Sequence, residues 1–135
     1  MGADSDIVRR LTNECFVGGD FSTYDELVSD DFVDHDPLPG FPGDKKGQLE
    51  TAKLVVGAFS DRKADMDDYV DTVDGRVVES WLFTGKHTGE FAGLPPSGKA
   101  VQVRGIEIWR CDGGEIVEHW GAVDLSDVFE KAGAG

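Results

Sequence analysis

The stretch that decides the fold is VQVRGIEIWRCDGGEIVEHWGAV, residues 101–123. Apolar and polar residues largely alternate on both sides of Asp112-Gly113-Gly114, a pattern typical of two antiparallel strands joined by a tight turn. The alternation changes phase at Gly105, so we predict a β-bulge at that glycine. This hairpin is expected to form one side of a curved sheet.

Upstream of this hairpin, the sequence predicts a second hairpin, around Asp74-Gly75, and helices before it. Helices followed by antiparallel strands in meander order predict an α+β domain, with helices covering one face of a bent sheet that encloses a pocket. Without internal repeats or linkers, residues 1–135 are expected to form a single domain. The expected helices span residues 5–17, a short segment capped by Ser22, and residues 46–59, and residues 31–37 form a short extended piece.

The composition restricts the partners and the compartment. The chain carries 27 acidic and 13 basic residues, a formal net charge of −14. Such a charge repels nucleic acid and anionic membranes, and a heavily acidic surface would suit a high-salt cytoplasm, as in a halophile. Residues 1–10 are polar and do not resemble a secretory signal, and no 18-residue apolar stretch occurs, so we expect a cytoplasmic protein. Cys15 and Cys111 lack ligand spacing and are expected to be small buried apolar residues.

Three histidines stand in local settings that a pocket would use: Asp34-His35-Asp36, Lys86-His87-Thr88 and Glu118-His119-Trp120. Each is either a functional imidazole or an exposed or hydrogen-bonded one. The two carboxylates beside His35 favour its charged form, which suits either proton transfer or a surface ion pair.

The last strand has two faces, and the sequence favours one of them as the inner face. Ile116 and Trp120 indicate that the even-numbered residues point into the pocket, which would bring Glu118 and Asp124 inside and turn His119 away. A buried carboxyl has a raised pKa and suits general acid/base chemistry. The alternative for Asp124 is an N-cap of the helical tail that follows it.

Glu107 would share the pocket if the bulge at Gly105 turned it inward, and would otherwise face solvent. The sequence contains no zinc-binding, nucleophile-elbow, Walker or dinucleotide-binding motif. We therefore expect any chemistry to need neither metal nor cofactor.

Three segments, in order along the chain, resemble motifs of the SnoaL-like polyketide cyclases of the NTF2-like superfamily. Residues 83–99, FTGKHTGEFAGLPPSGK, resemble the family pattern GxHTGEFxGxPPTGK. Residues 112–120, DGGEIVEHW, with Asp124 four residues further on, resemble DGKIxEHWxxxD. Residues 32–37, FVDHDP, resemble its early motif of the same sequence.

This resemblance implies an NTF2-like cone, commonly dimeric, whose characterised cyclases close a ring by intramolecular aldol condensation without metal or cofactor. It places the acid/base residue at Asp124, and His119, Trp120, His35 and His87 fall on the family pattern as well. For His119, this conflicts with the strand alternation, which turns it outward.

The leading hypothesis is a cofactor-independent cyclase acting on a small apolar carbonyl compound or polyketide ester. The alternatives are a non-catalytic small-molecule binder, an isomerase or hydroxylase on the same fold, and a dimerisation module that uses Val101 or Val103 on the outer face of the sheet. The predicted catalytic residues are Asp124, His119 and His35, and the predicted substrate-binding residues are Trp120, His87, Glu107, Trp81, Phe91 and Glu118.

Overall fold

The architecture was taken from a computed structural model, which describes residues 2–133 apart from the side chains of residues 66 and 67. The elements are α1 (Ala3–Arg10), the π-helix η1 (Leu11–Val17), α2 (Tyr24–Leu27), β1 (Val28–Asp34), α3 (Lys45–Ala58), β2 (Phe59–Asp71), β3 (Arg76–His87), β4 (Ala100–Asp112), β5 (Glu115–Asp124) and α4 (Ser126–Lys131). The predicted order of helices, hairpins and tail is confirmed.

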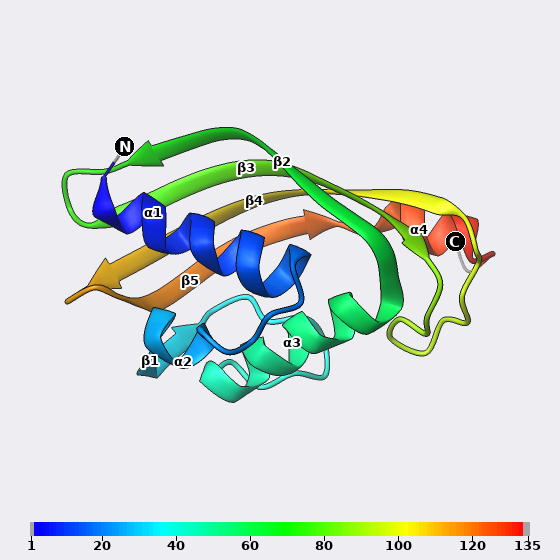
Figure 1. Ribbon diagram of the computed structural model, residues 1–135, viewed down its shortest axis with the longest axis horizontal. Helices are drawn as coiled ribbons and strands as arrows, with labels where there is room; N and C mark the ends of the chain where they lie inside the picture. Colours follow the sequence, from blue (N-terminus) through cyan, green and yellow to red (C-terminus); the bar gives the residue numbers. More distant parts are fainter. Residues whose placement is uncertain (1, 134–135) are drawn as a thin grey trace.

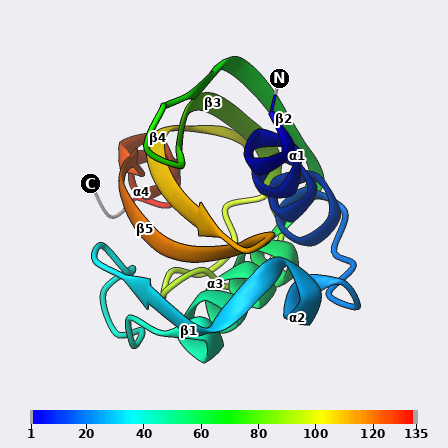
Figure 2. The ribbon, with the colours of Figure 1, turned by 90° about the vertical axis from the view of Figure 1, so that its left-hand side faces the viewer.

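One strongly curved sheet forms the body of the molecule (Figure 1). Its strand order is β1-β5-β4-β3-β2, in which β2 to β5 form an antiparallel meander and β1 lies parallel to β5. The sheet is curved, and α1 and α3 lie on its concave side (Figure 2). The expected α+β class and bent sheet are therefore confirmed.

The N-terminal helix closes one side of the cone. In its apolar stripe, Val8, Leu11 and Cys15 are fully buried and Ile7 and Phe16 are partly buried, as the sequence periodicity predicted. From Leu11 the chain continues without a break as a π-helix, which ends where the Gly18 N–H donates to the Asn13 carbonyl. Part of η1 reaches the interior cavity, in keeping with the tendency of π-helical segments to lie at functional sites.

The two other N-terminal helices have different starts. The Asp44 side chain accepts a hydrogen bond of 2.8 Å from the Gly47 N–H and caps α3. The short α2 begins after Thr23 and has no side-chain cap. The prediction that Ser22 caps it is wrong, because the Ser22 hydroxyl donates instead to Asp20.

Gly105 does not form a β-bulge. Strand β4 pairs residue by residue with β3 and β5 through this position, and its inner and outer residues alternate without interruption. A side chain at Gly105 would overlap the indole of Trp81, which lies across it. The sequence alternation shifts by one residue here for a different reason. The inward-facing residue Glu107 is polar, and the apolar residue Ile106 beside it is exposed on the outer face.

The bulge lies on β5 instead, and it reverses the predicted faces of that strand. Cys111 pairs with Ile116 and Arg110 with Glu118, so Val117 is an extra residue between two register positions. A one-residue insertion exchanges the faces of everything that follows. His119 therefore points inward, and the predicted inward orientation of the even-numbered residues beyond Ile116, namely Glu118, Trp120 and Asp124, is wrong.

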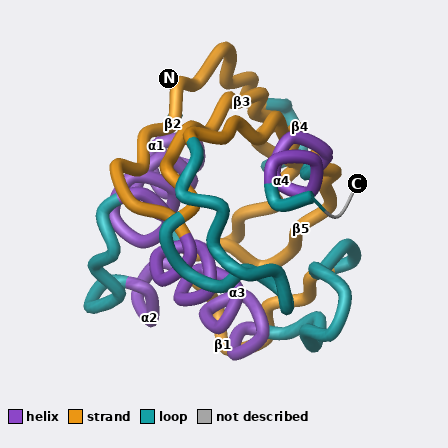
Figure 3. Tube along the Cα trace, turned by 90° about the vertical axis from the view of Figure 1, so that its right-hand side faces the viewer, coloured by secondary structure: helices purple, strands orange, loops and turns teal. Residues whose placement is uncertain are grey.

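Two apolar clusters close the two ends of the cone. The first packs η1 and α2 against the sheet through residues such as Leu11, Tyr24 and Trp109. The second, with Phe59 and Phe91 among its members, lies at the other end. There the loop of residues 88–99 crosses the opening, with α4 beside it (Figure 3). An interior cavity remains between these clusters.

Two further sequence expectations concern burial, and a third concerns membrane-spanning segments. Cys15 and Cys111 are both free and buried, as expected. Val101 and Val103 also face the interior, so the hypothesis that they form an outer interface is wrong. Within residues 2–133, no helix has the length and apolar character needed to cross a membrane.

Candidate active site

The cavity has a volume of about 190 Å³ and apolar walls. Polar side chains gather at one end of it, from β1, β3, β4, β5 and α3. An apolar cavity with a few convergent polar groups is the usual form of a small-molecule site. The aromatic and aliphatic walls are formed by Phe16, Val17, Leu38, Val55, Phe59, Trp81, Phe83, Phe91, Val103, Trp109, Val123 and Leu125.

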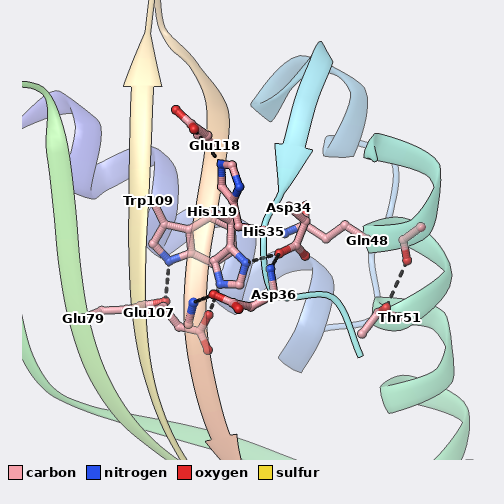
Figure 4. A network of polar contacts seen from close by, with 12 residues as sticks. Asp34, His35, Asp36, Gln48, Thr51, Glu79, Glu107, Trp109, Glu118 and His119 are labelled. Carbon is pink, nitrogen blue, oxygen red and sulfur yellow. Dashed lines mark hydrogen bonds and ion pairs between the residues drawn. The ribbon is translucent and has the colours of Figure 1, made fainter. Parts of the chain in front are cut away.

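The centre of the polar end is His119, held between two carboxylates (Figure 4). Its Nδ1 lies 2.7 Å from Asp34 Oδ1, and its Nε2 contacts Glu107 Oε2. These contacts follow from the strand pairing, because Asp34 pairs with His119 between β1 and β5. About nine-tenths of each of the three side chains is inaccessible to solvent.

The two carboxylates decide the charge of His119. Burial alone would lower the pKa of His119, but the hydrogen bonds to Asp34 and Glu107 outweigh burial and raise this pKa to about 9. At neutral pH the ring is therefore an imidazolium that donates both of its N–H groups to carboxylates. His119 consequently has no free N–H for a substrate, and its role is to position and charge its two partners.

Gly121 makes the contact between His119 and Glu107 possible. It pairs with Glu107 across β4 and β5. A Cβ at this position would lie 2.5 Å from Glu107 Oε2 and 2.9 Å from His119 Nε2. Only glycine leaves room for the carboxylate to reach the ring. The Gly121 N–H also donates to Asp36 Oδ2 over 2.9 Å, which holds Asp36 at the same end of the cavity.

A second inward carboxyl, Glu79, faces Glu107 directly across β3 and β4. It is 1% exposed, and its Oε1 accepts a hydrogen bond of 2.9 Å from Trp109 Nε1. Among the described residues, its buried Oε2 has no hydrogen-bond partner. Burial and, to a smaller extent, the nearby Glu107 raise the pKa of Glu79 to about 7.

Gln48 of α3 supplies an amide to the same end of the cavity. Its amide Oε1 lies 2.9 Å from the Tyr24 hydroxyl, whose single proton also has the Lys45 carbonyl oxygen as an acceptor at 2.7 Å. The Nε2 group is then the donor end of a side chain that is 5% exposed and lines the cavity. Figure 4 shows Gln48 extending from α3 toward Asp34.

His35 and Glu118 lie outside the cavity. His35 Nε2 lies 2.6 Å from Glu118 Oε2, and Arg110 Nε lies 2.6 Å from the other oxygen of that carboxylate. The His35 ring stacks on Trp120, with 4.8 Å between ring centroids. These predicted site residues therefore form a cluster on the outer face of the sheet.

Asp124 is exposed and also lies away from the His119 cluster. Its Oδ1 accepts a hydrogen bond of 3.0 Å from the Ser126 N–H, at the start of α4. The hydrogen bonds from Ser126 lower the pKa of Asp124. The N-cap alternative is close but wrong, because the N-cap residue of α4 is Leu125 and Asp124 lies one residue before it. The catalytic role of Asp124 stays a prediction, and its position on the outer face does not favour that role.

The other predicted binding residues divide into two groups. Trp81, Phe91 and Glu107 line the cavity. His87 is fully buried against Phe59, and the Ser97 N–H lies 3.4 Å from its Nδ1. His87 does not line the cavity and helps to hold the 88–99 loop.

Sequence reasoning missed six polar residues of the cavity lining: Thr12, Asp34, Asp36, Gln48, Thr51 and Glu79. Asp34 and Asp36 flank His35 in the early motif, and this proximity could have drawn attention to them. No group of three or more potential metal ligands suited to an ion was found among the described residues.

A model of the SnoaL-like polyketide cyclases matches residues 6–131, which is nearly the whole chain. The chain belongs to the SnoaL-like polyketide cyclase family. The resemblance noted from its motifs is thereby confirmed. Among curated proteins, none matches the sequence.

Solved structures of the same fold cover almost the full length of this SnoaL-like chain. IdmH from Streptomyces antibioticus, a proposed polyketide cyclase, is 31% identical with a TM-score of 0.80, over 96% of this chain and 98% of IdmH. A proposed polyketide cyclase from Acidithiobacillus ferrooxidans is 25% identical with a TM-score of 0.80, over 99% and 97%. AclR from Streptomyces galilaeus, a proposed hydroxylase, is 21% identical with a TM-score of 0.82, over 98% and 85%.

Proposed function

We propose that this SnoaL-like protein is a cofactor-independent enzyme that closes a ring by aldol-type acid/base chemistry on a small apolar carbonyl or polyketide-ester substrate. The observation that carries the proposal is the chain of contacts Asp34–His119–Glu107 at the polar end of an apolar cavity. Family membership and the proposed cyclase activity of IdmH add support.

In this proposal, Glu107 is the general base. His119 binds one of its oxygens and, as an imidazolium, favours the ionised carboxylate, so the other oxygen takes the α-proton of the substrate. The resulting enolate carbon attacks a second carbonyl carbon of the same molecule, forming the C–C bond. The protonated Glu107 then returns the proton to the new alkoxide oxygen, so the reaction needs no external acid.

Gln48 is the proposed donor to the enolate oxygen. Its amide N–H groups can donate to an oxygen that becomes more negative as the α-proton leaves, and such donors preferentially stabilise the transition state. The Tyr24 hydroxyl lies beside the oxygen of this amide. Asp34 keeps His119 oriented and charged and is a positioning residue in this scheme.

The test is a panel of polyketide methyl esters and other apolar β-dicarbonyl compounds, measured by thermal shift and then by turnover. Binding with ring closure, or with exchange of the α-proton for deuterium in D₂O, supports the enzyme. Binding without either reaction identifies the protein as a small-molecule binder. If no member of the panel binds, the proposed substrate class is wrong.

We also propose that the outer face of the sheet forms a homodimer interface. Val78, Ile108 and Trp120 form a row across three paired strands, and Ile106 beside them is 56% exposed. Burying such a row in a second copy would remove apolar surface from water. Light scattering coupled to gel filtration should show a dimer, and Ile106→Glu should give a monomer with unchanged circular dichroism.

A further inference from the structure

The charge of the cavity lining points to a feature of the ligand that acid/base chemistry does not require. Four carboxyl side chains line the cavity: Asp34, Asp36, Glu79 and Glu107. Within the described part of the chain, no lysine or arginine lines it. His119 supplies a single positive charge between Asp34 and Glu107, and neither Glu79 nor Asp36 has a lysine or arginine beside it in the lining. An anionic ligand would therefore be repelled.

Glu79 is the carboxyl whose hydrogen bonding is incomplete. It is 1% exposed and lines the cavity, and Trp109 satisfies only one of its oxygens. The second oxygen is buried with no hydrogen-bond partner, which is costly for an acceptor removed from water. The Tyr69 hydroxyl also acts on this carboxyl as a hydrogen-bond donor and lowers its pKa, but it is neutral and supplies no positive charge.

The walls next to Glu79 suit a cation as well. Trp81 and Phe83 follow Glu79 by two and four residues along β3, and all three side chains line the cavity. Aromatic faces attract ammonium groups through their electron-rich ring faces, and this attraction is stronger in a site removed from water. A carboxylate beside aromatic walls is therefore a suitable environment for a protonated amine.

We infer that the cavity takes an apolar ligand that carries a protonated amine, with the ammonium group bound at Glu79 and the apolar body against the aromatic walls. The inference rests on the proposed function for the role of this cavity as a ligand site. It adds the charge of the ligand. The ammonium donates to the Glu79 carboxylate and supplies the positive charge that this end of the lining lacks.

The experiment compares three probes of similar shape by isothermal titration at pH 7.5: 2-naphthylmethylamine, 2-naphthylmethanol and 2-naphthoic acid. A charge-assisted hydrogen bond to a buried carboxylate should make the amine bind about tenfold tighter than the alcohol, with the carboxylic acid weakest. Equal binding of amine and alcohol, or tightest binding of the acid, would overturn the inference while leaving an apolar cavity for the proposed function. If none of the three binds, the inference is overturned, and the panel of β-dicarbonyl compounds still decides the proposed function.

Variants assign the effect to Glu79. Glu79→Gln keeps the shape and removes the charge, so it should abolish the preference for the amine and leave binding of the alcohol within about twofold. Glu118→Gln makes the same change in net charge on the outer face and should leave the preference intact. Tyr69→Phe should also leave the preference for the amine over the alcohol intact. A preference that persists in Glu79→Gln would overturn the inference even if the variant folds normally.

Discussion

Two histidine–carboxylate clusters lie on opposite faces of the sheet around β5, and they differ mainly in burial. Inside, His119 contacts Asp34 and Glu107, and each of these side chains is 9–10% exposed. Outside, His35 contacts Glu118 at a comparable distance, but the side chains are 40% and 21% exposed. The two clusters should therefore contribute very different amounts to the free energy of unfolding, because water competes with the outer pair and screens it.

The largest expected difference is in stability. His119→Ala removes the cation between two buried carboxylates and should lower the free energy of unfolding by about 3–5 kcal/mol. His35→Ala should lower it by less than about 1 kcal/mol. Urea denaturation of both variants, followed by circular dichroism, measures this contrast. Equal losses for the two histidines would contradict the assignment of His119 to a buried ion cluster.

Stability should also fall between about pH 6 and pH 9. The pKa of His119 is raised to about 9, so its stabilising contribution is complete below the unfolded pKa near 6.5 and is lost as pH rises through 9. The expected loss is on the order of 2–3 kcal/mol. Glu79, whose pKa is raised to about 7, changes stability in the same direction at lower pH, because the folded protein retains its proton longer.

Three variants separate these contributions. Urea denaturation at a series of pH values should show that His119→Gln loses most of the decline above pH 7, whereas His35→Gln keeps it. Glu79→Gln should flatten the curve below pH 7. A wild-type curve that rises from pH 6 to pH 9 would contradict the charged state assigned to His119.

The contact between Glu107 and His119 can be broken without removing either residue. Gly121→Ala places a methyl group where the Glu107 carboxylate lies and should cost about 1–3 kcal/mol of stability. Turnover should fall with it, because Glu107 loses its position. A suitable control is Gly57→Ala on α3, where an added Cβ would meet nothing within 4 Å. If Gly121→Ala were as stable and active as the wild type, the contact would be unimportant.

The smallest effect is expected for the outer cluster. Glu118→Gln weakens the pairs with His35 and Arg110, both partly exposed, and should change stability by about 0.2–1 kcal/mol. Turnover should stay within about twofold of the wild type. Added salt should reduce the stability difference further, since exposed charges are screened. A large loss of activity would assign a functional role to the outer face.

Local sequence patterns predicted the elements well but not which face of a strand points inward. The helices, both hairpins and the tail follow from apolar spacing and turn residues, which act within a few positions. The bulge at Val117 depends on how β5 pairs with β4, which is set by packing between distant residues. Because one extra residue exchanges the faces, this single error moved Glu118, Trp120 and Asp124 inside and His119 outside.

Glu79 was missed for a related reason. On β3, the inner residues Val77, Trp81 and Phe83 alternate with outer residues that are partly apolar too, such as Val78 and Leu82, so neither face stood out. The acidic residue was therefore not recognised as inward-facing. The motif resemblance included His119, which the structure turns inward, although alternation alone argued for the opposite orientation.

The most direct test of the account is the rate of α-proton exchange in D₂O, on a β-dicarbonyl compound that binds the wild-type protein, for Glu107→Gln and Asp124→Asn. The account predicts that Glu107→Gln loses about 10²–10⁴-fold in rate while still binding the compound. Asp124→Asn should exchange at close to the wild-type rate. Loss of exchange in Asp124→Asn, with Glu107→Gln unaffected, would contradict it and return the base to the position that the motif indicated.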